Sequence, residues 1–169
     1  EWDPPRDYSL ERGSDALETV EIPDDAEVVV VGALVPILKR LKERGKPYAV
    51  IEMDPRTLKQ DELPFWVPVE RTSEVVAKTD LLVVTGTSIL FHSLEPILAA
   101  TKPGTRVVVV GPTASMLPGA FFRRGVSVIG GDLVYRSDDL LDILSEGGSG
   151  YHFFGKSADR IIIRNAGID

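Results

Sequence analysis

Cysteine is absent from this 169-residue sequence, and histidine occurs only twice. The absence of cysteine excludes disulfide bonds, thiolate zinc sites, iron–sulfur clusters and a cysteine nucleophile within these residues. Positive charge is also scarce, because the 19 lysines and arginines are outnumbered by 26 aspartates and glutamates, which gives a net charge of −7. This balance argues against nucleic acid or an anionic membrane surface as a partner. No apolar run approaches the roughly 18 residues of a membrane-spanning helix, so we expect a cytoplasmic protein.

The remaining composition is that of one folded domain. Hydrophobic residues make up 43% of the chain, which is enough for a sizeable core at this length. Prolines and acidic residues crowd residues 1–24, which we interpret as a linker or domain-junction segment containing one short helix. Residues 25–169 are then expected to form the domain itself.

Short apolar runs alternate with amphipathic segments along that domain. Val28–Val31 precedes a helical pattern over 35–44, which Gly45 ends. The pattern predicts further strands over 48–51, 81–84, 106–110, 126–129 and 160–164, with helices after residues 84 and 110 and over 138–146. Because the central strands are apolar throughout, both faces of their sheet should be covered. The sequence therefore predicts an α/β, Rossmann-like, doubly wound and mostly parallel sheet with helices on both faces and a C-terminal edge strand.

Two loops at the expected carboxyl ends of strands are rich in hydroxyl groups. They read Thr85-Gly86-Thr87-Ser88 and Gly111-Pro112-Thr113-Ala114-Ser115. Ligands of open parallel sheets bind at such ends, where hydroxyls and backbone N–H groups at a helix start suit a phosphate or carboxylate. Simple capping of the following helix explains the same residues equally well.

Glu52 ends the second predicted strand, twenty residues after Gly32. An acid at this place binds ribose hydroxyls in nucleotide-binding Rossmann folds. The first loop lacks the G-x-G-x-x-G pattern and contains Leu34, Val35 and Pro36, which argues against NAD in the standard mode. An adenosine ligand without pyrophosphate, such as S-adenosylmethionine, stays open, as does a solvated carboxylate at a strand end.

Few side chains in the sequence are able to hold a metal ion. Without cysteine, the donors near the expected crevice are Glu52, Asp54 and His92, which suit hard or borderline divalent ions. Neither His92 nor His152 belongs to a recognised zinc spacing, so a lone surface histidine is the competing interpretation of each. No Ser-His-Asp set is readable, and whether the protein is an enzyme stays open.

The order of these loops resembles a known family. The shared motifs are Val31-Gly32, Glu52 with Asp54-Pro55, Thr85-Gly86-Thr87, Gly111-Pro112-Thr113 with Pro118, Gly130-Gly131, Glu146-Gly147-Gly148 and Ile161–Ile163. Through them, residues 15–165 resemble the C-terminal, Rossmann-like half of the "Putative heavy-metal chelation" family of uncharacterised prokaryotic proteins. Phe91-His92-Ser93 departs from the asparagine-containing tract common in the family. The resemblance also implies an N-terminal domain similar to that of enolase, which we expect to be absent from this chain.

The resemblance implies a domain that binds a small molecule or metal complex and handles metals or cofactors, with a divalent metal ion or metal complex as cofactor. The alternatives are a transferase that uses an adenosine cofactor such as S-adenosylmethionine and a non-catalytic domain that docks an N-terminal partner domain or a second copy. The candidate ligand-binding residues are Gly32, Glu52, Asp54, Thr85, Gly86, Thr87, Ser88, Gly111, Pro112, Thr113, Ser115 and Gly131.

Overall fold

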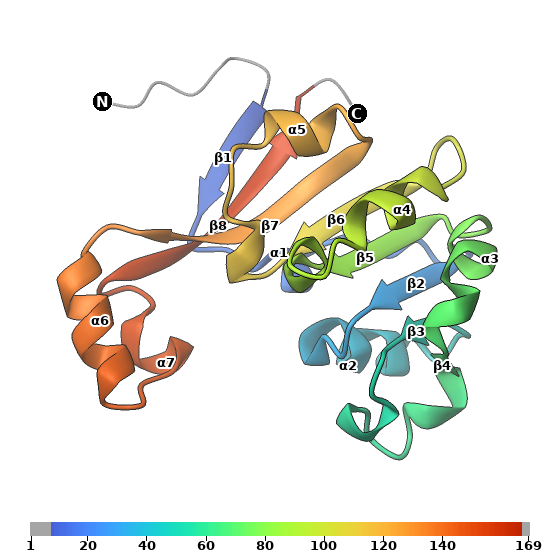
Figure 1. Cartoon of the computed structure of the whole chain (residues 1–169), viewed down its shortest axis with the longest axis horizontal. Helices are drawn as coiled ribbons and strands as arrows, with labels where there is room; N and C mark the ends of the chain where they lie inside the picture. Colours follow the sequence, from blue (N-terminus) through green and yellow to red (C-terminus); the bar gives the residue numbers. More distant parts are fainter. Residues whose placement is uncertain (1–7, 167–169) are drawn as a thin grey trace.

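The computed structural model describes residues 8–166, which form a single eight-stranded sheet flanked by helices (Figure 1). The strands are β1 (Tyr8–Arg12), β2 (Val28–Val31), β3 (Ala49–Ile51), β4 (Trp66–Val67), β5 (Leu81–Thr85), β6 (Arg106–Val110), β7 (Val126–Val134) and β8 (Ala158–Asn165). The α-helices are α1 (Ala16–Thr19), α2 (Val35–Arg44), α3 (Thr72–Val76), α4 (Leu94–Ala99), α5 (Gly119–Phe122), α6 (Ser137–Ser145) and α7 (Gly150–Phe153). Short 3-10 helices are η1 (Pro55–Thr57), η2 (Leu63–Phe65), η3 (Val69–Arg71), η4 (Gly86–Ile89) and η5 (Pro112–Ala114).

The strand order is β1-β8-β7-β6-β5-β2-β3-β4. From β4 to β7 every neighbouring pair is parallel, whereas β8 and β1 are added antiparallel. The parallel part has the order found in nucleotide-binding Rossmann folds. The predicted doubly wound, mostly parallel sheet is therefore confirmed, and its winding direction reverses between β2 and β5.

Helices cover both faces of the sheet, as its valine-rich strands require. Residues alternate along each strand, so Val28 and Val30 pack with α1 and α2 in one core, and Val29 packs with α3, α4 and α5 in the other. Gly45 ends α2 with φ +67°, a left-handed conformation that glycine adopts without strain.

The two ends of the chain correct the sequence prediction. The C-terminal strand β8 is not at the edge, because β1 pairs with its outer side from Tyr8↔Asn165 to Arg12↔Ile161. Part of the expected linker over 1–24 is therefore the edge strand of the sheet, followed by the short helix α1. Residues 1–7 and 167–169 lie outside the described part of the chain.

The helices expected directly after residues 84 and 110 begin differently. Each loop first makes a 3-10 turn, η4 or η5, and the α-helix starts several residues later. In the first loop, Ser88 Oγ donates to Thr85 O at 2.8 Å, and His92 has φ +53°, which interrupts a right-handed helix. In the second, Pro118 precedes α5. The expected α-helix N-terminus at either loop is therefore wrong.

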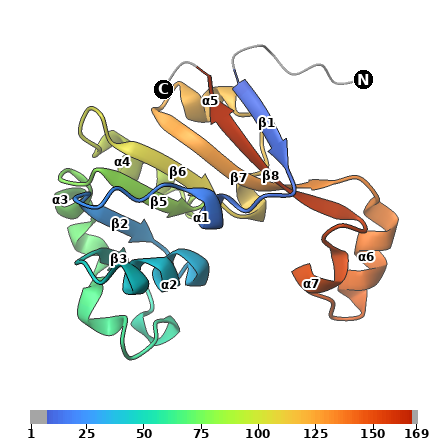
Figure 2. The ribbon, with the colours of Figure 1, turned by 180° about the vertical axis from the view of Figure 1, so that it is seen from behind.

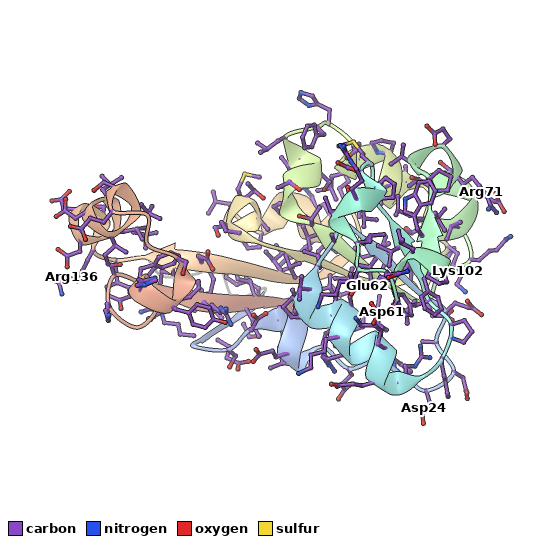
Figure 3. The ribbon with its side chains drawn as sticks, turned by 90° about the horizontal axis from the view of Figure 1, so that it is seen from below. Asp24, Asp61, Glu62, Arg71, Lys102 and Arg136 are labelled. Carbon is purple, nitrogen blue, oxygen red and sulfur yellow. The ribbon has the colours of Figure 1, made fainter. Side chains whose placement is uncertain are left out.

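Strands β7 and β8 run beyond the rest of the sheet and carry α6 and α7 at their far end (Figure 2). We call residues 133–157 the arm. Figure 3 shows Arg136 on this arm, far from Lys102 on the body of the sheet. The strand predicted over 126–129 continues to Val134 because β8 pairs with it as far as Val134↔Ala158, so Gly131 lies within a strand, not in a loop.

Candidate functional site

A hollow of about 730 Å³ opens where the sheet reverses its winding, beyond the carboxyl ends of β2, β3 and β5. We call it the crevice. Five predicted residues line it: Gly32, Glu52, Thr85, Thr87 and Ser88. Apolar side chains and further hydroxyls complete the walls, from Val31, Ala33, Leu34, Ile51, Met53, Val69, Thr72, Ser73, Phe91, Ser93, Pro96 and Ile97. Glu52 is the single ionisable side chain among these residues.

The Glu52 carboxylate is held by backbone groups of two loops. Oε2 accepts a hydrogen bond from Ala33 N at 3.0 Å, and Oε1 accepts one from Asp54 N at 3.2 Å. The backbone oxygen of Glu52 accepts from Trp66 Nε1 at 2.9 Å. Glu52 thus stands fixed at the crevice, with lone pairs left on both carboxylate oxygens for a ligand.

The first loop has few donors left for a phosphate. Ala33 N donates to Glu52, Leu34 N donates to Gly32 O at 2.8 Å, and Pro36 has no N–H. Gly32 has φ +99°, and a Cβ there would stand 2.9 Å from Thr85 Cγ2. The positive φ and the close contact with β5 therefore explain why residue 32 is a glycine, and no phosphate ligand is needed to explain it.

The hydroxyls of the loop after β5 have separate roles. Ser88 is buried and donates to Thr85 O, which holds the 3-10 turn η4 together. Thr85 Oγ1 and Thr87 Oγ1 lie 3.0 Å apart, and Thr87 is exposed to the crevice. The Thr87 hydroxyl is therefore the group of this loop best placed to contact a ligand.

A second hollow, of about 250 Å³, lies beyond β6 and β7 on the side of α1. Three of the predicted ligand-binding residues line it, namely Gly111, Pro112 and Gly131. Its ionisable side chains are those of Asp15, Asp132 and Arg160. Burial raises the pKa of the Asp132 carboxyl, and the charge of Arg160 opposes that rise. Asp132 stands at a position that the sequence indicates, directly after Gly130-Gly131 at the carboxyl end of a predicted strand. The sequence gives no such signal for the other two, because Arg160 falls in the predicted edge strand and Asp15 in the predicted linker.

The remaining predicted residues line neither hollow. Asp54 caps η1 and pairs with Arg56, whose hydrogen bonds hold the pKa of this carboxyl below its usual range. Ser115 Oγ accepts from Asp132 N at 2.8 Å. Gly86 and Thr113 touch each other, since a Cβ on Gly86 would stand 2.5 Å from Thr113 Oγ1.

The metal set expected from the sequence is not assembled. His92 is exposed and lies outside the crevice, while Asp54 is bound to Arg56. Within residues 8–166, no three histidine, aspartate or glutamate side chains gather closely enough to hold a metal ion. Over the same residues, no helix is long and apolar enough to cross a membrane.

Large apolar side chains are exposed in the loops that follow β3, η4 and η5. They are Met53 after β3, Leu90 and Phe91 after η4, and Met116 and Leu117 after η5, and we call them the apolar rim. Exposed fractions run from 47% for Met116 to 74% for Leu117. Exposed apolar side chains gathered at one end of a sheet are typical of a surface that meets another molecule or domain.

The strand order and the crevice at its reversal define a Rossmann-like α/β domain. The chain belongs to the DUF364 family, described as "Putative heavy-metal chelation", whose model matches residues 15–163. It is 29% identical over 147 residues to the uncharacterized protein MJ0500 of Methanocaldococcus jannaschii, covering 86% of this chain and 55% of that protein.

Two crystal structures of DUF364 proteins of unknown function share the fold. The one from Pyrococcus horikoshii has a TM-score of 0.71 and 19% identity, over 88% of this chain and 58% of that chain. The one from Desulfitobacterium hafniense has a TM-score of 0.66 and 17% identity, over 82% and 52%. The chain thus spans little more than half the length of the relatives that it matches.

Proposed function

We propose that this domain handles a metal or cofactor in the cytoplasm, by binding the organic part of a small metal complex in the crevice. The lining of the crevice carries this proposal. Its apolar walls suit the body of an organic ligand, and the hydroxyls of Thr72, Thr85 and Thr87 suit polar groups at its edge. Glu52 supplies one carboxylate, which suits a complex of net positive charge whose metal keeps donors of its own. The family description supports a role with metals.

A second candidate ligand is S-adenosylmethionine. The parallel strands have the nucleotide-binding Rossmann order, and Glu52 follows the strand whose terminal acid binds ribose in such folds. S-adenosylmethionine carries no phosphate, so the lack of free N–H donors in the first loop does not argue against its binding. A transferase is the class of enzyme that this ligand would indicate.

The apolar rim supports a partner at the mouth of the crevice. We expect this partner to be a further part of the protein, corresponding to the length of the relatives that this chain does not match, because the chain covers 55% of the Methanocaldococcus protein. Met53, Leu90, Phe91 and Leu117 would then be buried at a domain interface. A second copy of the chain is the competing occupant, and sedimentation at several concentrations distinguishes the two.

The proposal is tested by thermal unfolding of the chain with cobalt(II) alone, an iron(III) porphyrin as a tetrapyrrole chelate, and S-adenosylmethionine. A ligand at about one hundred times its Kd stabilises a protein by roughly 2.7 kcal/mol, which is readily measured. Stabilisation by the chelate, reduced in Thr87→Val and unchanged in the exposed control Thr19→Val, would support the proposal. Stabilisation by S-adenosylmethionine alone would favour the transferase. No stabilisation by any of the three probes would contradict a crevice that binds ligands in this chain.

A further inference from the structure

Asp132 and Arg160 face each other across strands β7 and β8 but do not pair. They are directly opposed in the antiparallel register, a position in which opposite charges ordinarily attract. Arg160 turns instead to Asp15, with Nη1 2.8 Å from Asp15 Oδ2, and its guanidinium carbon lies 4.8 Å from the centre of the Phe154 ring. The cross-strand partner of Asp132 is thereby occupied elsewhere.

The Asp132 carboxylate is left without a direct partner in the second hollow. Its backbone N–H donates to Ser115 Oγ, but within residues 8–166 the side-chain oxygens accept no hydrogen bond and join no ion pair. A half-buried carboxylate normally accepts several hydrogen bonds, so its position at the wall of a hollow indicates room for a donor from outside the chain.

The backbone of three glycines forms part of the wall of this hollow, and one of them packs closely against helix α1. Gly111, Gly130 and Gly131 line it, and a Cβ on Gly130 would stand 2.5 Å from Ala16 Cβ. Leu17, Val110 and Ile161 add apolar surface, and the rings of Phe153 and Phe154 close the side toward the arm. A volume of about 250 Å³ lies just below the usual range for drug-sized ligands and suits a molecule of amino-acid size.

We propose that the second hollow binds a free amino acid, with its ammonium group on Asp132 and its carboxylate on Arg160. An ammonium group supplies three donors to a carboxylate that has none. Arg160 uses Nη1 for Asp15 and keeps Nε and Nη2 for the ligand carboxylate. The apolar side chain of the amino acid would lie against Phe153 and Phe154. This site is lined by other residues than the crevice and does not depend on the function proposed for it.

The test is calorimetric titration of the chain with each common L-amino acid, to about 10 mM, which covers millimolar dissociation constants. At least one is expected to bind. Its decarboxylated amine and its deaminated acid should each bind at least about tenfold more weakly, as should the amino acid to Asp132→Asn and to Arg160→Lys. Asp138→Asn, the same change at an exposed residue of α6, and Thr87→Val in the crevice should leave the affinity unchanged.

Thermal unfolding without ligand establishes that each variant is folded. If Arg160→Lys does not fold, the binding test is made with Asp132→Asn alone. The proposal is overturned if no amino acid binds over this range, or if Asp132→Asn binds as the unmodified chain does. It is also overturned if the amine binds as tightly as the amino acid, because the hollow would then be a site for a simple cation.

Discussion

The Glu52 carboxylate and the Ala33 backbone N–H are joined by a hydrogen bond of 3.0 Å, which ties the end of β3 to the loop after β2. In dinucleotide-binding Rossmann folds, that loop offers its N–H groups to a pyrophosphate. In this protein, the Glu52 carboxylate accepts the hydrogen bond from that loop in place of a pyrophosphate. The same carboxylate therefore has a structural role as well as a candidate role in binding.

We predict that Glu52→Ala lowers the free energy of unfolding by about 1–3 kcal/mol, because the part-buried N–H groups of Ala33 and Asp54 lose their acceptor. Glu52→Gln should cost less, since its amide oxygen still accepts one of these bonds. Urea unfolding of both variants measures the difference. Equal stability of Glu52→Ala and the unmodified chain would mean that water replaces the carboxylate without loss.

The contact between the loops after β5 and β6 gives a second prediction. In Gly86→Ala, the new Cβ would stand 2.5 Å from Thr113 Oγ1 and 2.8 Å from Ala114 N, and the backbone nitrogen has no freedom to turn away. We expect a loss of about 1–3 kcal/mol in the free energy of unfolding. Gly119→Ala is the matched control, because its Cβ meets only the flexible end of Arg123 at 3.3 Å. Similar midpoints of denaturation for the two variants would refute the tight contact.

The central sheet was predictable from the sequence because its signal is local. Val28–Val31 and Arg106–Val110 consist almost entirely of valine, as is typical of strands buried on both faces. The position of Glu52 beside Gly32 followed from the same pattern, since carboxyl ends of neighbouring parallel strands share one edge of the sheet.

The two ends of the sheet and the second hollow were not predictable in this way. The edge strand Tyr8–Arg12 has an ordinary polar sequence and is fixed by pairing with residues about 150 positions later. Asp15, Asp132 and Arg160 meet only because β8 returns antiparallel between β7 and β1. The predicted metal ligands are not brought together for a related reason. Asp54 is hydrogen-bonded to Arg56, and the spacing of residues in the sequence does not show which of several possible partners Asp54 will bind.

Lys42 of α2 forms ion pairs with Asp61 and Glu62, in the segment that follows Glu52. Figure 3 shows Asp61 and Glu62 close together. Lys42 Nζ lies 3.0 Å from Glu62 Oε1, and the Glu62 side chain is only 4% exposed. We predict that Lys42→Met costs about 1–3 kcal/mol of stability, because it leaves a buried carboxylate without its cation. In the control Lys39→Met, the lost ion pair to Glu43 is long and exposed, so the cost should be about 0–1 kcal/mol. Thermal unfolding measures both variants, and equal melting temperatures would contradict a stabilising role for the buried ion pair.

The burial of Asp132 makes the stability of the chain depend on pH in a direction that can be checked. Desolvation raises the pKa of this carboxyl, Arg160 opposes the rise and Asp15 adds to it. A carboxyl whose pKa is higher in the folded state stabilises that state below the unfolded pKa, about 3.9. The stabilisation is lost as the pH rises through the folded pKa.

The side-chain amide introduced by Asp132→Asn does not ionise, so we predict that this variant is more stable than the unmodified chain at pH 7. The difference should shrink as the pH falls toward about 3, where the carboxyl of the unmodified chain is protonated in both states. Chemical denaturation of the two proteins across this range measures it, and other titrating groups cancel in the comparison because both chains contain them. A stability difference that stays constant with pH would show that the Asp132 carboxyl is as well solvated in the folded chain as in the unfolded one.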